Sequence, residues 1–259
     1  MESEFEGKTI AITGAAGGVG QLLCRYFGSR GATVAALDIS DAIMGVAEQL
    51  KSEGINVKAV RVDLTKAKEV VDAFASFGDV HVLVNNAAVS FRPTLAKTDP
   101  DSWRADMEAN LGAAYHCAYA VLPQMIERKG GAIVNIGSAN AIIALGEPAY
   151  SAAKAGMISL TKTIALECGK KGIRCNIILP GTIRTPFWQK RQAEDPHVLE
   201  KLEKWYPLGR IVEPIEIVNT VAFLASDKAA AITGAVLPVD CGLSAGNIVM
   251  ARELLVQDL

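Results

Sequence analysis

Tyr150 and Lys154 bring a phenol and an ammonium together within one short segment, Tyr-Ser-Ala-Ala-Lys. Four residues make about one helical turn, so both side chains project from one face if the segment is helical. A nearby ammonium favours the phenolate and lowers the pKa of the tyrosine toward the physiological range. The pair therefore predicts a tyrosine that transfers protons. The alternative is an exposed tyrosine beside a solvated lysine.

A cluster of glycines follows the first strand-like run, 8–13, and precedes a helical pattern that ends near Gly31. Glycine allows a tight turn in which backbone amides approach a diphosphate, and a helix N-terminus adds favourable dipole charge. The spacing T-G-x-x-x-G-x-G differs from the usual G-x-G-x-x-G of dinucleotide sites but serves the same physics. The cluster predicts a dinucleotide site, although turns and helix caps also use glycine. It consists of Gly14, Gly17, Gly18 and Gly20.

An acidic residue, Asp38, ends the second strand-like run, 33–37. A carboxylate at this position suits hydrogen bonds to the hydroxyls of an adenosine ribose, and it would repel a 2′-phosphate. Gly17 and Ile39 stand where a compensating cation is expected. The sequence therefore favours NAD over NADP. A helix cap or turn residue is the alternative for Asp38.

Strand and helix patterns alternate along the chain to position these residues. We expect helices over 41–52, 66–77 and 101–128, and strands over 57–62, 80–84, 132–136 and 173–179. Polar residues or turns follow several strand ends, where an open parallel sheet binds its ligand: Asp63, the turn 85–88, Ser138 and Pro180-Gly181. The pattern predicts an α/β fold with a Rossmann-type doubly wound parallel sheet, helices on both faces, and a single domain over 1–259.

Composition argues against several classes of function. The net charge of −2, with 21% charged residues, supplies no long-range field for nucleic acid or an anionic membrane. No apolar run approaches the ~18 residues that a membrane span needs. Five scattered cysteines and three separated histidines indicate neither a disulfide framework nor a metal site. The acidic start is unlike a signal peptide, and we expect a cytoplasmic protein.

Taken in order, these segments resemble the short-chain dehydrogenase/reductase family across nearly the whole chain. Each segment is common by itself, but the ordered set is specific. It comprises the glycine turn 13–20, Asp63, the turn Asn-Asn-Ala-Ala at 85–88, Asn110, Ser138, the segment from Tyr150 to Lys154, and Pro180-Gly181.

The resemblance implies catalytic roles for four residues. Tyr150 would be the general acid/base, and Lys154 would bind the nicotinamide ribose and lower the pKa of the tyrosine. Ser138 would donate a hydrogen bond to the substrate oxygen. Asn110 would hold a water in a proton relay, which gives a reason for an asparagine inside a helix, where it is otherwise unfavourable.

The resemblance also implies a set of cofactor contacts. Two positions depart from the family pattern, because Ala88 and Cys241 stand where the family often has glycine. We expect Cys241 to be a small buried residue near a C-terminal strand over 236–239. The implied contacts are Gly14, Gly17, Gly18, Val19, Gly20, Asp38, Asp63, Leu64, Asn86, Ala87, Ala88, Tyr150, Lys154, Pro180, Gly181, Ile183 and Thr185.

The segment 184–207 resembles the family's mobile lid, which closes over substrate. Cations on this segment and on nearby loops suggest recognition of an anionic substituent, and a solvated basic surface is the alternative. The candidate substrate contacts are Ser138, Asn140, Arg184, Trp188, Lys190 and Arg191.

The favoured interpretation is an NAD-dependent dehydrogenase that oxidises a secondary or hemiacetal hydroxyl in a sugar, polyol or cyclic alcohol. One alternative is a carbonyl reductase, such as a 3-oxoacyl-carrier-protein reductase. Another is a non-catalytic binding protein that senses a dinucleotide. We expect a small-molecule substrate, neither nucleic acid nor membrane as a partner, and a homotetramer by analogy with the family.

Overall fold

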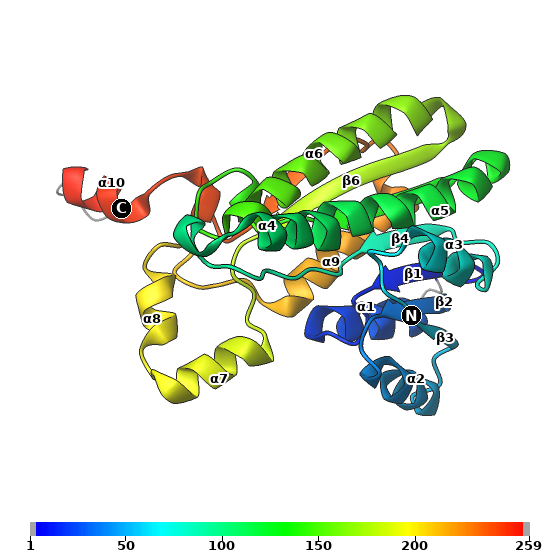
Figure 1. Cartoon of the computed structure of the whole chain (residues 1–259), viewed down its shortest axis with the longest axis horizontal. Helices are drawn as coiled ribbons and strands as arrows, with labels where there is room; N and C mark the ends of the chain where they lie inside the picture. The colour runs from blue at the N-terminus through cyan, green and yellow to red at the C-terminus, as the bar shows by residue number, and fades with distance from the viewer. Residues whose placement is uncertain (1–3, 256–259) are drawn as a thin grey trace.

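A sheet of seven parallel strands forms the centre of the fold, in the order β3-β2-β1-β4-β5-β6-β7 (Figure 1). The computed structural model describes residues 4–255, apart from the side chains of Pro186, Phe187, Gln189, Lys190 and Leu255. The strands are β1 Thr9–Thr13, β2 Thr33–Asp38, β3 Val57–Arg61, β4 Val82–Asn85, β5 Gly131–Ile136, β6 Ile173–Pro180 and β7 Val236–Val239. The predicted doubly wound α/β domain is confirmed.

Helices cover both faces of the sheet, as predicted (Figure 1). One face packs against α1 Gly18–Gly28, α2 Ala42–Ser52 and α9 Pro214–Ala225; the other packs against α3 Ala67–Ala75, α5 Ala113–Arg128 and α6 Pro148–Cys168. Side chains alternate across each strand, so Ile10 and Ile12 of β1 enter the first core and Ala11 enters the second. Burial on both faces explains why these strands read as continuous apolar runs.

The strand order reverses beside β1, which pairs with β2 on one side and with β4 on the other. The loops that follow these strands therefore diverge to opposite faces and leave a crevice at the carboxyl edge of the sheet. The glycine turn after β1 and the turn after β4 both lie at this edge. The crevice formed by the strand order therefore lies where the sequence predicted a dinucleotide site.

The long helix predicted over 101–128 is interrupted. It consists of α4 Pro100–Met107, a π-helical turn Glu108–Gly112, and α5. The π-helical turn interrupts the helix without interrupting the run of helix-forming residues, so the sequence pattern predicted one continuous helix. Asn110 lies inside this turn and is buried.

The segment predicted as a lid, 184–207, forms two short helices, α7 Pro186–Glu194 and α8 Val198–Glu203. They stand outside the layers at the end of the molecule that also carries α10 Ile248–Leu255 (Figure 1). Over residues 4–255, no helix is both long and apolar enough to cross a membrane. The same residues contain no cluster of three or more His, Cys, Asp or Glu side chains that could hold a metal ion.

Candidate active site

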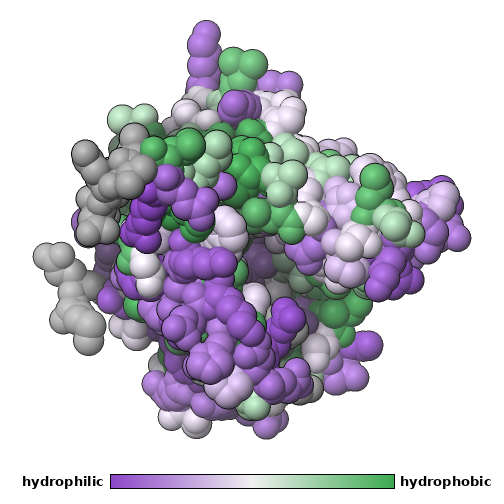
Figure 2. Space-filling model, turned by 90° about the vertical axis from the view of Figure 1, so that its left-hand side faces the viewer, coloured by the Kyte–Doolittle hydropathy of each residue, from purple (hydrophilic) through white to green (hydrophobic). Residues whose placement is uncertain are grey.

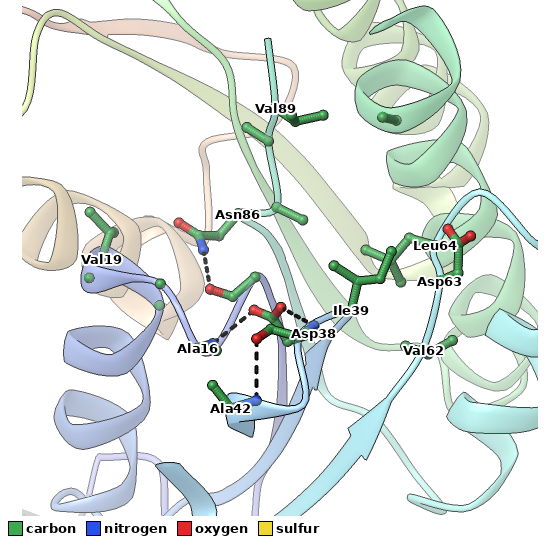
Figure 3. A pocket seen from close by; sticks show the side chains of 18 of the residues that line it. Ala16, Val19, Asp38, Ile39, Ala42, Val62, Asp63, Leu64, Asn86 and Val89 are labelled. Atoms are coloured by element: carbon green, nitrogen blue, oxygen red, sulfur yellow. Dashed lines mark hydrogen bonds between the residues drawn. The ribbon is translucent and has the colours of Figure 1, made fainter. Parts of the chain in front are cut away.

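A cavity of about 890 Å³ opens at the crevice beside β1 (Figure 3). Twelve of the predicted cofactor residues line it: Gly14, Gly17, Gly18, Val19, Gly20, Asp38, Asp63, Leu64, Asn86, Ala87, Ala88 and Thr185. Sequence reasoning did not assign the other lining residues, which include Ala16, Ile39, Ser40, Val62, Val89, Phe91 and Ala109. Ile39, Ser40 and Val62 come directly after β2 or β3, and that position is the signal that could have found them.

The two turns at the cavity are fastened to each other. Asn86 Nδ2 donates to the carbonyls of Thr13 (2.9 Å) and Gly14 (3.1 Å), and the amides of Asn86 and Ala87 donate to Thr13 Oγ1. Gly14 has a φ of +63°, and a Cβ there would lie 2.9 Å from the Cα of Ala87. Only glycine therefore allows this approach of the two turns.

Asp38 reaches back over the glycine turn (Figure 3). One carboxylate oxygen accepts from Ala16 N and the other from Ser40 N, each at 2.9 Å. Asp38 is thus a turn residue, as the alternative interpretation held, and it also lines the cavity. A carboxylate has about four acceptor positions, so these two bonds leave room for ribose hydroxyls.

No Lys or Arg belongs to the described lining of this cavity. The cation beside Ile39 is Arg61, whose Nε donates to Ile39 O at 3.0 Å and pairs with Asp41 at 2.9 Å. Asp63 accepts two hydrogen bonds from Thr65. Although burial acts to raise the pKa of Asp63, these bonds hold it below its usual value. The charged groups of the lining are therefore both carboxylates.

Helix α6 begins two residues before Tyr150 and confirms that Tyr150 and Lys154 share one helical face. Lys154 Nζ lies 5.5 Å from the centroid of the Tyr150 ring. The lysine is fully buried, and its Nζ donates to Ile136 O at the end of β5 at 2.9 Å. The helix thus carries the ammonium to the carboxyl edge of the sheet.

The expected lowering of the tyrosine pKa is wrong for this structure. Burial raises the pKa of Tyr150 to about 12; a hydrogen bond with the Ser138 side chain opposes this, and the carboxylates of Glu147 and Asp106 add to it. Burial also lowers the pKa of Lys154 to about 7. Both pKa values shift toward the neutral forms because Lys154 is fully buried and Tyr150 is partly buried, which the spacing of the two residues could not reveal.

Ser138 and Asn140 lie in the turn that follows β5. Asn140 N donates to Ser138 Oγ at 3.2 Å, and Ser138 Oγ donates to Asn140 Oδ1 at 3.3 Å. With the Tyr150 contact, the structure brings the predicted substrate-oxygen donor and the predicted acid/base together. This grouping permits proton transfer at a hydroxyl or carbonyl oxygen.

Asn110 connects the π-helical turn to the loop after β4. Its Nδ2 donates to Val89 O and to Asp106 O, both at 2.8 Å, and its Oδ1 accepts from Val89 N at 3.4 Å. The side chain therefore holds the loop that borders the cavity. Its predicted place in a water relay stays a prediction.

The remaining nicotinamide-end predictions lie along one chain segment beyond β6. Pro180 ends that strand, and Gly181 N donates to Val239 O at 3.2 Å. Ile183 forms an isolated parallel bridge with Val212. Of this segment only Thr185 lines the cavity, so the contacts expected of the other three residues stay predictions.

Of the cations predicted for the substrate end, Arg184 is paired with two carboxylates. Arg184 pairs with Glu213 at 2.7 Å and with Glu203 at 3.0 Å. The Arg191 guanidinium lies 5.3 Å from the centroid of the Trp188 ring. The side chain of Lys190 lies outside the described residues. Arg184 is thus committed to the contact between the lid and α9 rather than left for an anionic substrate.

Known proteins resemble this chain over nearly its whole length. Residues 14–244 match a family described as enoyl-(acyl carrier protein) reductase. The crystal structure of an oxidoreductase of the short-chain dehydrogenase/reductase family from Burkholderia thailandensis has a TM-score of 0.92 and 49% identity, covering 97% of this chain and 98% of that one.

Two further relatives carry more specific descriptions. The 3-oxoacyl-(acyl-carrier-protein) reductase FabG of Thermotoga maritima is 36% identical over 92% of this chain and 98% of its own. A gluconate 5-dehydrogenase from Burkholderia cenocepacia, solved with NADP and tartrate, has a TM-score of 0.87 and 30% identity, covering 95% of this chain and 98% of that one.

Proposed function

The chain belongs to the short-chain dehydrogenase/reductase family of oxidoreductases, and we propose that it transfers a hydride between NAD and a secondary or hemiacetal hydroxyl. The observation that carries this proposal is the meeting of Tyr150, Ser138 and Lys154 at the carboxyl edge of β5, on the switch-point side of the sheet. A sugar, a polyol or a cyclic alcohol is the substrate class.

The chain's own residues bind the reacting oxygen of the substrate and transfer its proton. NAD, when bound, supplies the hydride acceptor. Tyr150 first releases its own phenolic proton to solvent; the phenolate then takes the hydroxyl proton, and the Ser138 hydroxyl stabilises the oxygen as negative charge develops on it. Lys154 holds the end of β5 through Ile136 O. The glycine turn, Asp38 and Asp63 would hold the adenosine and diphosphate part of the cofactor.

Asp38 supports NAD as the cofactor. Its carboxylate lines the cavity, Ile39 beside it is 60% exposed, and the described lining contains no cation that could bind a 2′-phosphate. The related gluconate 5-dehydrogenase was solved with NADP, so a direct test is needed. Calorimetry should give a dissociation constant for NADP at least about tenfold weaker than for NAD, and Asp38→Asn should narrow that ratio.

The matched control for this measurement is Asp72→Asn, which removes a carboxylate from the exposed face of α3. It should leave the ratio of the two affinities unchanged. Equal affinities of the wild-type protein for NAD and NADP would overturn the role given to Asp38.

A carbonyl reductase is a second candidate, and one observation favours it. A tyrosine with a pKa near 12 is protonated at neutral pH, which is the form that donates a proton to a carbonyl oxygen. The similarity to 3-oxoacyl-(acyl-carrier-protein) reductase points the same way. A pure dinucleotide sensor is less favoured, because it does not require Asn110, Ser138, Tyr150 and Lys154 together.

A single set of assays separates the three functions. The purified protein is tested for NAD- and NADP-coupled oxidation of neutral sugars, polyols and cyclic alcohols, and for NADH- and NADPH-coupled reduction of 3-oxoacyl thioesters. We expect NAD-coupled oxidation to be fastest. Exclusive thioester reduction would establish the second candidate, and tight cofactor binding without any turnover would establish the sensor.

A further inference from the structure

Glu147 stands three residues before Tyr150, where the chain enters α6. Its backbone is left-handed, with φ +50° and ψ +61°, a conformation that non-glycine residues rarely adopt. Two backbone hydrogen bonds hold it there: Glu147 N donates to Pro93 O at 3.0 Å, and Glu147 O accepts from Ser151 N at 2.8 Å. The backbone of Glu147 is therefore fixed at the start of α6.

A short hydrogen-bond chain links this carboxylate to the Ser138 hydroxyl. Asn140 Nδ2 lies 3.4 Å from Glu147 Oε2, and Asn140 Oδ1 accepts from Ser138 Oγ at 3.3 Å. A carboxylate only accepts hydrogen bonds, so Glu147 determines which end of the Asn140 amide faces Ser138. Glu147 thus belongs to the substrate end of the site, two hydrogen bonds from the serine.

Most of the acceptor capacity of Glu147 is unused within the described part of the chain. Asn140 Nδ2 is its one side-chain hydrogen-bond donor there, and neither carboxylate oxygen forms an ion pair. Arg184, one of the cations predicted for the substrate end, is held by Glu203 and Glu213. Asp106 adds a second, buried carboxylate whose charge also acts on Tyr150. Two carboxylates, Glu147 and Asp106, therefore act on Tyr150 from outside the Tyr150–Lys154 pair.

We propose that Glu147 determines the charge of the substrate: it accepts a hydrogen bond from a hydroxyl or ammonium next to the reacting carbon and disfavours a carboxylate or phosphate there. The inference rests on the proposed oxidation of a hydroxyl. It reverses the anionic-substrate hypothesis that the sequence suggested, because Arg184, one of the cations on which that hypothesis depended, is paired with two carboxylates while an acidic acceptor remains open.

Three cyclohexanols that differ in one substituent test this inference. They are trans-cyclohexane-1,2-diol, trans-2-aminocyclohexanol and trans-2-hydroxycyclohexanecarboxylate, which offer the same ring and secondary hydroxyl beside a neutral, a cationic and an anionic group. We measure kcat/KM with NAD for the wild type and Glu147→Gln. The wild type should favour the diol and the amine over the carboxylate by about tenfold or more, and Glu147→Gln should remove most of that difference.

Glu167→Gln is the matched control, since it removes the same charge from an exposed position of the same helix, about 30 Å along its axis. It should leave the substrate ratios within about twofold. Asparagine tolerates a left-handed backbone, so Glu147→Asn should fold at least as well as the glutamine variant and reproduce its ratios. Wild-type ratios in Glu147→Asn, or a wild-type preference for the carboxylate, would overturn the inference.

Failure of the proposed function gives a different result. If the wild type oxidises none of the three compounds, their binding to the NADH-loaded protein is measured by calorimetry. The same order of affinities, removed by Glu147→Gln, would support the role of Glu147. Equal affinities, or tightest binding of the carboxylate, would refute it.

Discussion

Burial shifts the pKa values of Tyr150 and Lys154 in opposite directions. It raises the pKa of the phenol to about 12 and lowers that of the ammonium to about 7. The spacing of the two residues indicated that a phenolate and an ammonium would attract each other. The free-energy cost of removing each charged form from water exceeds this attraction, with Lys154 Nζ 5.5 Å from the centroid of the Tyr150 ring. Burial therefore favours the neutral form of both side chains.

Tyr150→Phe removes one oxygen from the centre of this arrangement. We expect kcat to fall by a factor of about 10²–10⁴, the usual contribution of general acid–base catalysis, with NADH affinity nearly unchanged. Steady-state kinetics and calorimetry on the same preparation measure both quantities. Tyr115→Phe, on an exposed tyrosine, is the control. Near-normal turnover in Tyr150→Phe would contradict the acid/base assignment.

The burial of Lys154 predicts a pH dependence of stability. The folded-state pKa of about 7 lies below the ordinary value of 10.5, so between these values the unfolded chain binds a proton that the folded protein does not. Stability therefore rises with pH across this window, by at most about 1.4 kcal/mol per pH unit. The penalty for burying the charge is fully present below pH 7.

Denaturant unfolding of the wild type and Lys154→Met at several values from pH 7 to pH 10 measures this effect. The unfolding free energy of the wild type should rise with pH relative to that of Lys154→Met, because methionine cannot titrate. Lys162→Met, at an exposed position on the same helix, should show no such slope. The window ends near pH 10, where the raised pKa of Tyr150 begins to act in the opposite direction.

Among the elements, the π-helical turn Glu108–Gly112 determines where the loop after β4 can lie. Its Asn110 replaces missing backbone partners by donating to Val89 O and Asp106 O. This arrangement joins α4, α5 and the cavity-lining loop through one buried amide. An asparagine unfavourable in an ordinary helix is thus explained by the geometry of the turn.

Asn110→Leu keeps the side-chain volume but removes these hydrogen bonds. Leaving the buried Asp106 carbonyl and the part-buried Val89 carbonyl without this donor should cost about 2–4 kcal/mol and lower the Tm by about 5–10 °C. Differential scanning calorimetry measures the loss, and Asn56→Leu, which removes an exposed hydrogen bond, is the control. An unchanged Tm would show that Asn110 does not fasten this loop.

Local patterns predicted the elements well, and long-range contacts limited what could be said of the site. The glycine turn, Asp38 and the Tyr150 helix follow from short stretches of sequence and lie where expected. The ion pairs of Arg184 with residues 19 and 29 positions away could not be foreseen from spacing. The second role of Asp38, as acceptor for Ala16 N, requires the fold that brings β2 beside β1.

At the scale of the whole molecule, the surface of the end that carries α7, α8 and α10 is divided into a hydrophobic and a hydrophilic part. Hydrophobic residues gather in its upper part and hydrophilic residues cover its lower part (Figure 2). The loops after β4 and β5 expose Phe91, Leu95, Ile142 and Leu145. Exposed apolar side chains on the loops beside the carboxylates of Glu147 and Asp106 suit a substrate with an apolar ring and a polar substituent, consistent with the proposed cyclic alcohols.

The outer surface of α5 and α6 carries a separate group of exposed apolar side chains. Tyr115 and Tyr119 of α5 and Leu166 of α6 are 51%, 59% and 85% exposed, on helices that pack against the same face of the sheet. Exposed large apolar residues on neighbouring elements are typical of protein–protein contacts. We therefore propose that these helices meet a second copy of the chain in a homotetramer.

The double variant Tyr119→Glu with Leu166→Lys should break this contact, because both substitutions place a charge where apolar surface would be buried. Light scattering after size exclusion should give about four chains of 27.4 kDa for the wild type and a smaller assembly for the variant. Met44→Lys, on the exposed face of α2, adds a charge to a comparable apolar residue away from these helices and should keep the wild-type mass. A double variant with the wild-type mass would place the interface elsewhere. Because the substituted residues lie outside the cavity, cofactor affinity should persist in the smaller assembly.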